Sequence, residues 1–374
     1  MISIVKSVLG DSSAAWRANQ PFFATAFVYV LVALAAAVHW NIPVSLELYN
    51  LAFLRAGSVV IVILFVIVSM RVLLERPQRP FPALWARLVA NKLPNRIIIG
   101  LPVALVLPVF FSLFTSIKGG LSKIMPFYAD STIIAIDRTI HGGVDAWQIL
   151  HPLLGYGLTI YGLNSFYNIW FVEMFVVLFC VTFSTSSGRL RSQYLVAFVL
   201  TWALLGNLAA SIFASVGPAF VMPYYDDAAF SPLMNHLRTI DVTYPLWALK
   251  AQGALLANAA IGGPQFGSGI SAFPSLHVAV ATLNAIYLWR FGAMLRWAGV
   301  AFLIIIQIGS VHLAWHYGID GYASMLATPI IWFVAGLIAK PWPRSTRIEI
   351  PSHSRSGLRT RVHGFLRSLR RRVG

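Results

Sequence analysis

Two histidines and one aspartate in the last third of the chain have the residue types and the spacing to act together on one bond. His316 and Asp320 are four residues apart, so on a helix they share a face and the carboxylate can accept the proton of one imidazole nitrogen. The other nitrogen is then left basic and oriented, as a nucleophile or a general base requires. We predict that His277 approaches from an adjacent helix as the acid that protonates a leaving oxygen.

The apolar stretches around these residues predict how they meet. One stretch follows His277, a short basic break covers residues 290–296, and a second stretch ends near His316. Two helices joined by so short a turn are antiparallel, so the two histidines lie at the same depth. Ser275 and the backbone N–H groups after Pro274 stand at a predicted helix N-terminus, where free donors and the helix dipole suit a phosphate. The alternative, that these polar residues only cap helix ends, suits one histidine alone better than the whole set.

The composition identifies an integral membrane protein. Of the 374 residues, 58% are hydrophobic and only 11% are charged, whereas soluble domains are about 25% charged. We expect an all-α fold, a polytopic membrane helical bundle, because an apolar run of about 20 residues crosses a bilayer. Eight such runs are predicted, near residues 22–39, 52–74, 97–117, 163–183, 195–216, 275–292, 297–314 and 319–339.

The net charge of +16 is distributed unevenly, and the distribution predicts the topology. With eight spans both termini lie on one face, and this face carries 22 of the 28 lysines and arginines. The positive-inside rule then places both termini in the cytoplasm and the histidines on the exoplasmic, or periplasmic, face of the plasma (inner) membrane.

Three regions are expected along the chain. Residues 1–96 would form a transmembrane hairpin and a basic cytoplasmic loop, residues 97–339 a six-helix catalytic domain, and residues 340–374 a basic cytoplasmic tail. We expect this tail to bind anionic lipid headgroups. No nucleic-acid partner is expected, because no folded reader module accompanies the tail. The oligomeric state is not predicted.

Two long connections, residues 118–162 and 221–272, lie on the same predicted face as the histidines. Both are rich in aromatic and apolar residues, so we expect interfacial helices that cap the site. Tyr224 and Tyr225 in the second connection are candidates for substrate contact. Glu173 lies inside the fourth predicted span, where a carboxylate is costly unless it is paired or faces water. We expect Glu173 either to line the site or to make a buried structural hydrogen bond.

The histidine motifs resemble those of a known family. FPSLHVA (residues 273–279) and HYGID (316–320) look like the second and third motifs of the type 2 phosphatidic acid phosphatase superfamily of membrane lipid phosphatases and phosphotransferases. The P-S-L-H form is more similar to the inositol phosphorylceramide synthase (inositolphosphotransferase) branch than to the phosphatases, which have P-S-G-H. Weaker similarity in DRTIHGG (137–143) and SVGPAF (215–220) extends the resemblance to about residues 118–339.

This resemblance implies a mechanism through a phosphohistidine, with no metal or other cofactor. His316 would attack phosphorus, Asp320 would orient it, and His277 would protonate the departing alcohol. Ser275 would help to hold the phosphoryl oxygens. Water would resolve the intermediate in a phosphatase, and a second alcohol would resolve it in a transferase. Membrane lipids are the implied substrates.

The chain departs from the family's pattern in its positive charges. The phosphatases have Ser-Arg seven and six residues before the nucleophilic histidine, where this chain has Gly309 and Ser310, and the first motif of Lys, six residues and Arg-Pro is not found. A missing arginine removes a bidentate clamp on phosphate. Other side chains on the outer face would then have to bind phosphate, with Lys123 as the first candidate, followed by Lys118, Arg238 and a protonated His312.

Several functions compete for this pattern. The P-S-L-H form and the missing arginine favour a phosphotransferase that moves a lipid headgroup over a lipid phosphate phosphatase. A metal hydrolase is a minor alternative, since His312, His316 and Asp320 have spacings that zinc sites use. A lipid transporter would need polar or broken helices through the whole membrane, whereas these polar residues gather at one face. A non-catalytic scaffold would tolerate the loss of either histidine.

Overall fold

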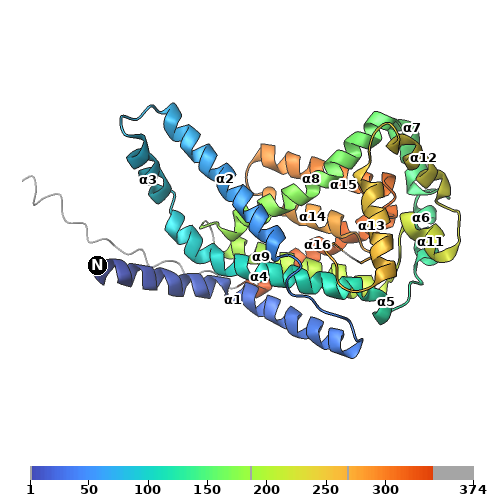
Figure 1. The fold of residues 1–374 in the computed structure, drawn as a ribbon, viewed down its shortest axis with the longest axis horizontal. Helices are drawn as coiled ribbons and strands as arrows, with labels where there is room; N and C mark the ends of the chain where they lie inside the picture. The colour runs from blue at the N-terminus through green and yellow to red at the C-terminus, as the bar shows by residue number, and fades with distance from the viewer. Residues whose placement is uncertain (1, 186–187, 268, 340–374) are drawn as a thin grey trace, which may run out of the picture. The chain divides into compact units, whose positions relative to one another are not determined.

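Helices form all of the regular structure in the part of the chain that the computed structural model describes, residues 2–185, 188–267 and 269–339, with side chains from residue 16 onward. Figure 1 shows the long helices, which are α1 (Ile2–His39), α2 (Asn50–Leu74), α4 (Leu93–Gly119), α8 (Gly157–Thr182), α9 (Gly188–Thr201), α14 (Leu276–Leu288), α15 (Ala293–His312) and α16 (Gly318–Ile338). A π-helix (Trp202–Ala209) and α10 (Ala210–Ile212) continue α9. The predicted polytopic helical bundle is confirmed.

Among the described residues, seven helical segments are long and apolar enough to cross a membrane. The eighth predicted span, near residues 275–292, is shorter than expected: α14 has 13 residues and rises about 20 Å, whereas a bilayer core is about 30 Å thick. Helices α8, α9, α15 and α16 pack around α14, and Val278, Val280 and Leu283 are fully buried. Because protein surrounds α14, its length is not required to match the bilayer.

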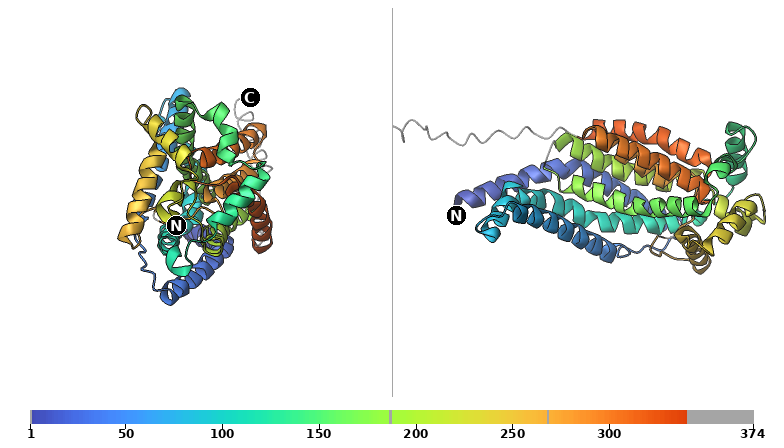
Figure 2. Two further views of the ribbon diagram at one scale, coloured as in Figure 1. Left: turned by 90° about the vertical axis from the view of Figure 1, so that its right-hand side faces the viewer. Right: turned by 90° about the horizontal axis from the view of Figure 1, so that it is seen from above.

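The cap is a set of short helices from the two long connections. It consists of α5 (Leu121–Ile124), α6 (Asp130–Ile140), α7 (Ala146–Leu154), a 3₁₀ turn (Pro218–Phe220), α11 (Val221–Tyr225), α12 (Ser231–Asp241) and α13 (Trp247–Ile261). Figure 2 shows α6, α7, α11 and α12 gathered at one end of the bundle. Local sequence explains one of these starts, because Asp145 and Gln148 form a capping box at the beginning of α7.

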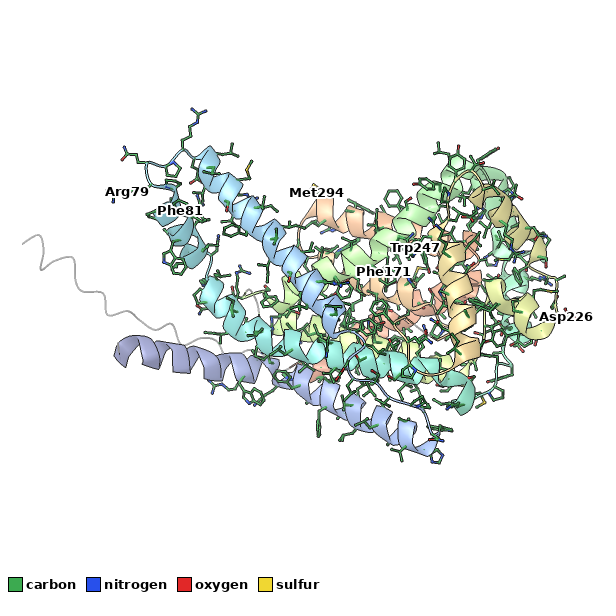
Figure 3. The ribbon with its side chains drawn as sticks, in the orientation of Figure 1. Arg79, Phe81, Phe171, Asp226, Trp247 and Met294 are labelled. Atoms are coloured by element: carbon green, nitrogen blue, oxygen red, sulfur yellow. The ribbon has the colours of Figure 1, made fainter. Side chains whose placement is uncertain are left out.

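Helix α2 and the following α3 (Pro80–Ala90) extend away from the cap. Figure 3 shows Arg79 and Phe81 at the turn between these helices and Asp226 in the cap, at opposite ends of the bundle. Most α2 side chains are exposed, as expected for a helix that faces lipid. The ring of Phe53 anchors α2, with its centroid 5.3 Å from that of Phe111 on α4.

A buried arginine ties several helices together at the end of the bundle that lies away from the cap. Arg191 at the start of α9 is 2% exposed. Its guanidinium donates to the Asn19 Oδ1 on α1 at 2.6 Å and to the Thr182 carbonyl oxygen at the end of α8 at 2.8 Å. The cation thus pairs with a helix C-terminus, where positive charge is favourable. Residues 340–374, which hold the predicted basic tail, lie outside the described residues.

Candidate active site

His316 lies in the turn between α15 and α16, next to the aspartate that the sequence pairs with it. Its Nδ1 is 3.2 Å from Oδ2 of Asp320, and the Tyr317 backbone N–H donates to the same oxygen at 3.0 Å. Because an ionised carboxylate only accepts hydrogen bonds, Nδ1 carries the proton. Nε2 of His316 is then the nitrogen with a lone pair, which is the requirement for a nucleophile.

His277 stands in the first turn of α14 and faces the first histidine. The two imidazole centroids are 6.5 Å apart. The two rings therefore border the same small space. Side chains of α8 hold the ring, since Trp170 and Tyr167 lie against it at centroid distances of 4.1 and 4.7 Å. The Trp170 indole N–H also donates to the His277 carbonyl oxygen at 3.0 Å.

The beginnings of α14 and α16 are joined directly, which fixes the relative positions of the two histidines. The Ser275 N–H donates to the Asp320 carbonyl oxygen at 3.1 Å. The Ser324 hydroxyl donates to the Ser275 carbonyl oxygen at 2.8 Å. Ser275 is the N-cap of α14 and is fully buried, so the structure places it beside the histidine pair, with its hydroxyl over the first turn.

Lys118 is the cation that the structure brings to the histidine pair. It lies at the end of α4, where its positive charge acts on the His277 imidazole. Lys123, the first candidate from sequence, is not brought there: its exposed Nζ donates to the Asn41 carbonyl oxygen at 2.9 Å. Arg238 is also elsewhere, because its exposed guanidinium donates to Asn235 on the same helix.

A partial motif in the sequence could have identified Lys118. Six residues separate it from Met125 and Pro126. This is the expected string of lysine, six residues and Arg-Pro, with methionine in place of arginine. A lysine therefore stands at the first position of that string, whereas the arginine that could bind phosphate bidentately is absent from it.

His312 does not share a helical face with His316, because α15 ends at His312. The chain then turns at Ala314, which has a φ of 62°. The buried ring of His312 instead lies 5.7 Å from that of His151 on α7, which is 4.5 Å from the ring of His236 on α12. Burial and the neighbouring His236 lower the pKa of His151. His312 therefore belongs to a histidine cluster under the cap, and its predicted role in phosphate binding lacks the expected geometry.

Asp130, the first residue of α6, is a buried centre of hydrogen bonding that the sequence does not reveal. Its Oδ1 accepts from the Gly217 N–H at 3.0 Å and the Tyr317 hydroxyl at 2.7 Å. Its Oδ2 accepts from the Val216 N–H at 2.8 Å and the Tyr225 hydroxyl at 2.7 Å. Burial, followed by the nearby Asp130, raises the pKa of Tyr317, so this hydroxyl stays protonated and donates. One carboxylate thus links the cap to the residue that follows His316.

The DRTIHGG motif makes a second connection between α6 and α16. Oδ1 of Asp137 accepts from the Ile319 N–H at 2.8 Å, and burial raises the pKa of this carboxyl. His141 lies 3.0 Å from the Tyr322 hydroxyl through Nε2. Gly318 makes this contact possible, because a Cβ there would lie 2.8 Å from the imidazole of His141. The motif therefore positions the start of α16, and its hydrogen bonds are made to that helix and not to His277 or His316.

The SVGPAF motif has a comparable structural role. The Ser215 hydroxyl accepts from the Phe273 N–H at 3.0 Å, which holds the segment before α14. Gly217 has a φ of 87°, and a Cβ at this position would lie 2.9 Å from the Trp315 carbonyl oxygen. Glycine therefore allows the motif to pass closely beside the turn that carries His316.

The three remaining candidates for substrate contact, Tyr224, Tyr225 and Glu173, lie in different surroundings. Tyr224 lines a cavity together with Lys118, while Tyr225 binds Asp130. Glu173 on α8 accepts from the Asn284 amide at 2.8 Å, and Asn284 in turn accepts from the Tyr194 hydroxyl at 2.6 Å. This arrangement matches the alternative expectation for Glu173, a buried structural hydrogen bond.

No three His, Cys, Asp or Glu side chains within the described residues converge to hold a metal ion. The zinc alternative required His312 to approach His316 and Asp320. The end of α15 at His312 removes the helical spacing on which that alternative depended.

The described helices thus place two histidines and a buried aspartate together in a bundle of membrane helices. The family model described as the PAP2 superfamily matches residues 131–334, more than half of the chain. The protein belongs to the PAP2 superfamily, and its membership indicates phosphatase or phosphotransferase activity. No curated protein and no solved structure matches the chain. The matched range contains His277, His316 and Asp320 and begins after Lys118.

Proposed function

We propose that this protein is a membrane phosphotransferase that moves a phosphoryl-linked headgroup between lipids through a phosphohistidine at His316, as in the inositolphosphotransferase branch. The observation that carries the proposal is the pairing of Nδ1 of His316 with Asp320 while the ring of His277 faces it at 6.5 Å. These three residues supply a nucleophile, the group that orients it, and an acid on the opposite side of the phosphorus atom.

The reaction proceeds in two displacements. In the first, Nε2 of His316 forms a bond to phosphorus, the bond from phosphorus to the leaving alkoxide breaks, and protonated His277 gives its proton to that oxygen. Asp320 stabilises the positive charge that develops on the imidazole of His316. In the second, neutral His277 takes the proton of an acceptor alcohol, the alcohol oxygen attacks phosphorus, and the P–N bond breaks. Both histidines then return to their starting states.

The charges near the histidines favour a phosphodiester donor. A phosphomonoester carries about 1.5 to 2 negative charges at neutral pH, whereas a diester carries one. Lys118 acts on His277, while Met125 stands where the family's first motif has an arginine. A single lysine matches the charge of a diester better than that of a monoester. Hydrolysis of a lipid phosphate is the second candidate, because the same site would act as a phosphatase if water replaced the acceptor alcohol.

We also propose the topology that the charge distribution indicates. Both termini would be cytoplasmic, and the cap with its site would lie on the exoplasmic side of the plasma membrane. The N-terminal hairpin would precede a catalytic domain at residues 97–339, and the basic tail would bind anionic lipid. A cysteine introduced at Thr239, an exposed position on α12 in the cap, should react with an impermeant thiol reagent outside intact cells. Labelling only after lysis would reverse the assignment.

The activity can be tested with purified protein and headgroup-labelled lipids. The panel would contain phosphatidylinositol with and without ceramide, phosphatidic acid and a prenyl pyrophosphate. His316→Ala should abolish turnover, and His277→Ala should reduce it by about 10²–10⁴-fold. His39→Ala, at the end of α1, is the matched control and should retain activity.

The products separate the two candidates. Product that forms only with acceptor supports the transferase, and free phosphate released without acceptor supports the phosphatase. An acid-labile label on the wild-type protein that is absent from His316→Ala would identify the phosphohistidine. The proposal fails if no lipid in the panel is turned over or if His316→Ala remains active.

A further inference from the structure

Three aromatic side chains of α8 lie against the ring of His277. Tyr167 stacks on the imidazole, with the planes 21° apart and the centroids 4.7 Å apart. Trp170 is closer, at 4.1 Å and 39°. Phe171, labelled in Figure 3, meets the imidazole at 5.9 Å and 86°. Residues three and four apart share one side of a helix, so a single turn of α8 supplies all three rings, which we call the aromatic cage.

The two histidines differ in what can balance a positive charge on the ring. His316 has the Asp320 carboxylate 3.2 Å from its Nδ1. None of the ion pairs among the described residues includes His277. The ionisable groups that act on His277 are His316 and Lys118, and both are cations when they are protonated. An aromatic face, in contrast, attracts a cation that lies within about 6 Å of the ring centroid.

The helices that pack around α14 bring other charged groups, but these have other partners or face outward. Helices α8, α9, α15 and α16 make these contacts. Their charged side chains are Glu173 on α8, which binds Asn284, Arg189 on α9, which is exposed, Arg191 on α9, which binds Thr182, Arg296 on α15, which lies over Trp289, and Asp320 on α16, which pairs with His316. Among the described residues, the aromatic cage is therefore the group beside His277 that favours a charged imidazole.

This kind of stabilisation suits the acid in the proposed mechanism. His277 has to hold a proton before the first displacement and give it to the leaving oxygen during that step. A carboxylate partner would hold the proton more tightly than an aromatic face does, because a charge-assisted hydrogen bond is stronger than a cation–π contact. The aromatic cage therefore favours the charged form and still allows the proton to leave.

Tyr167 also contacts the segment that carries His316. Its ring is nearly parallel to that of Trp315, at 8° and 6.3 Å, and Trp315 directly precedes His316. A Cβ at Gly309 would lie 3.3 Å from Cδ2 of Tyr167, so glycine leaves the room that this ring occupies. Gly309 stands where the family's phosphatases have serine. The departure from that pattern thus lies directly beside the aromatic cage.

We propose that Tyr167, Trp170 and Phe171 are positioning residues that hold the ring of His277 and stabilise its protonated form through cation–π contacts. The catalytic use of this proton rests on the proposed function. The protonation of His277, in contrast, can be measured without any turnover.

The protonation can be followed by NMR titration of the full-length protein in detergent with isotope-labelled histidine. The chain has nine histidines, and the signal that is missing from His277→Gln identifies the relevant one. Tyr167→Leu and Trp170→Leu should each lower the midpoint of the His277 titration by about 0.5–1.5 pH units. Tyr167→Phe keeps the ring and should keep the wild-type midpoint.

The matched control is Phe166→Leu, which removes an exposed ring from the same helix and should leave the midpoint unchanged. Thermal unfolding would establish that each variant is folded. Where a leucine variant does not fold, Trp170→Phe takes its place. It should give a smaller shift in the same direction, because phenylalanine attracts a cation less strongly than tryptophan does.

The pH profile of lipid turnover gives a readout that a loss of packing alone would not change. The alkaline limb of kcat/KM reports the essential acid of the free enzyme. This limb should move to lower pH in Tyr167→Leu and Trp170→Leu by the same amount as the NMR midpoint, and it should not move in Phe166→Leu.

The cage and the proposed function fail in different ways. A lowered midpoint in the leucine variants, with no lipid turned over by the wild type, would uphold the cage and refute the proposed function. Turnover in the wild type with an unchanged midpoint in both leucine variants would refute the cage alone. Reduced turnover in these variants with an unmoved alkaline limb would show that the rings only pack, and would refute the cage as well.

Discussion

Replacing Asp130 by asparagine removes one carboxylate oxygen from a buried site while keeping the size of the side chain. Each oxygen of Asp130 accepts one backbone N–H and one tyrosine hydroxyl. An asparagine oxygen can keep one such pair, and the tyrosine of the other pair can rotate its hydroxyl to accept from the new amide. A backbone N–H cannot reverse in this way. The N–H of Val216 or of Gly217 is therefore left facing an NH₂ group.

The expected loss follows from that single unsatisfied donor. A buried donor without a partner costs about 1–3 kcal/mol. Asp130 holds Tyr317, the residue directly after His316, so relaxation of this conflict displaces His316, the proposed nucleophile. If all of the cost appears in the transition state, turnover falls by about 5- to 150-fold. Because substrate binding is not changed, kcat should decrease while KM stays the same.

Two tyrosine variants provide matched controls for this prediction. Tyr317→Phe and Tyr225→Phe each delete one hydroxyl that donates to Asp130 at 2.7 Å. Only Tyr317 adjoins the nucleophile, so Tyr317→Phe should lower kcat more than Tyr225→Phe does. Thermal unfolding in detergent would establish that each variant is folded.

Equal losses in the two tyrosine variants would contradict a positioning role for Asp130. The same conclusion would follow if folded Asp130→Asn kept the wild-type kcat. A change in KM alone would instead indicate that the carboxylate acts on the substrate.

Three further predictions follow from the structure. Lys118→Met should lower kcat/KM by about 10- to 150-fold, because it removes one hydrogen bond to a charged group. Lys123→Met is the control and should leave kcat/KM unchanged. Both variants can be compared in a lipid-turnover assay. Gly318→Ala should lower the unfolding temperature, because its Cβ would lie 2.8 Å from the His141 imidazole, and an unchanged temperature would contradict this packing. Because the pKa of His151 is lowered in the folded protein, the unfolded chain binds a proton at this residue more readily than the folded chain does. The folded protein therefore loses stability as the pH falls below about 6.5. In thermal unfolding between about pH 7 and 5, His151→Gln should lose less stability than the wild type, and an equal loss would refute this.

The lengths of the apolar runs predict much of the fold, but they do not predict where α14 and α15 end. The run that begins near residue 275 continues in composition past Leu288, so α14 is predicted to be longer than it is. No glycine or proline marks the end of α15 at His312, and the turn uses Ala314 at positive φ instead. The four-residue spacing from His312 to His316 therefore crosses the end of a helix and does not place the two rings on one helical face.

Motif and topology together predicted that His277, His316 and Asp320 lie close to one another, but the residues around them depend on side-chain direction. Lys118 and Lys123 are five residues apart, yet only Lys118 is near enough for its charge to act on His277, while Lys123 binds the Asn41 carbonyl oxygen. Asp130 has partners from three separate segments. No local pattern could indicate that convergence.

The short length of α14 has a consequence for where the substrate must go. One end of this helix is followed by the basic turn at residues 290–296, and the other carries His277. If the basic turn lies at one bilayer surface, a rise of about 20 Å places His277 about 10 Å inside the opposite edge of an apolar layer about 30 Å thick. The phosphate of a lipid would therefore have to lie deeper than the headgroups of neighbouring lipids to react. The cap would then form a polar depression in the membrane surface.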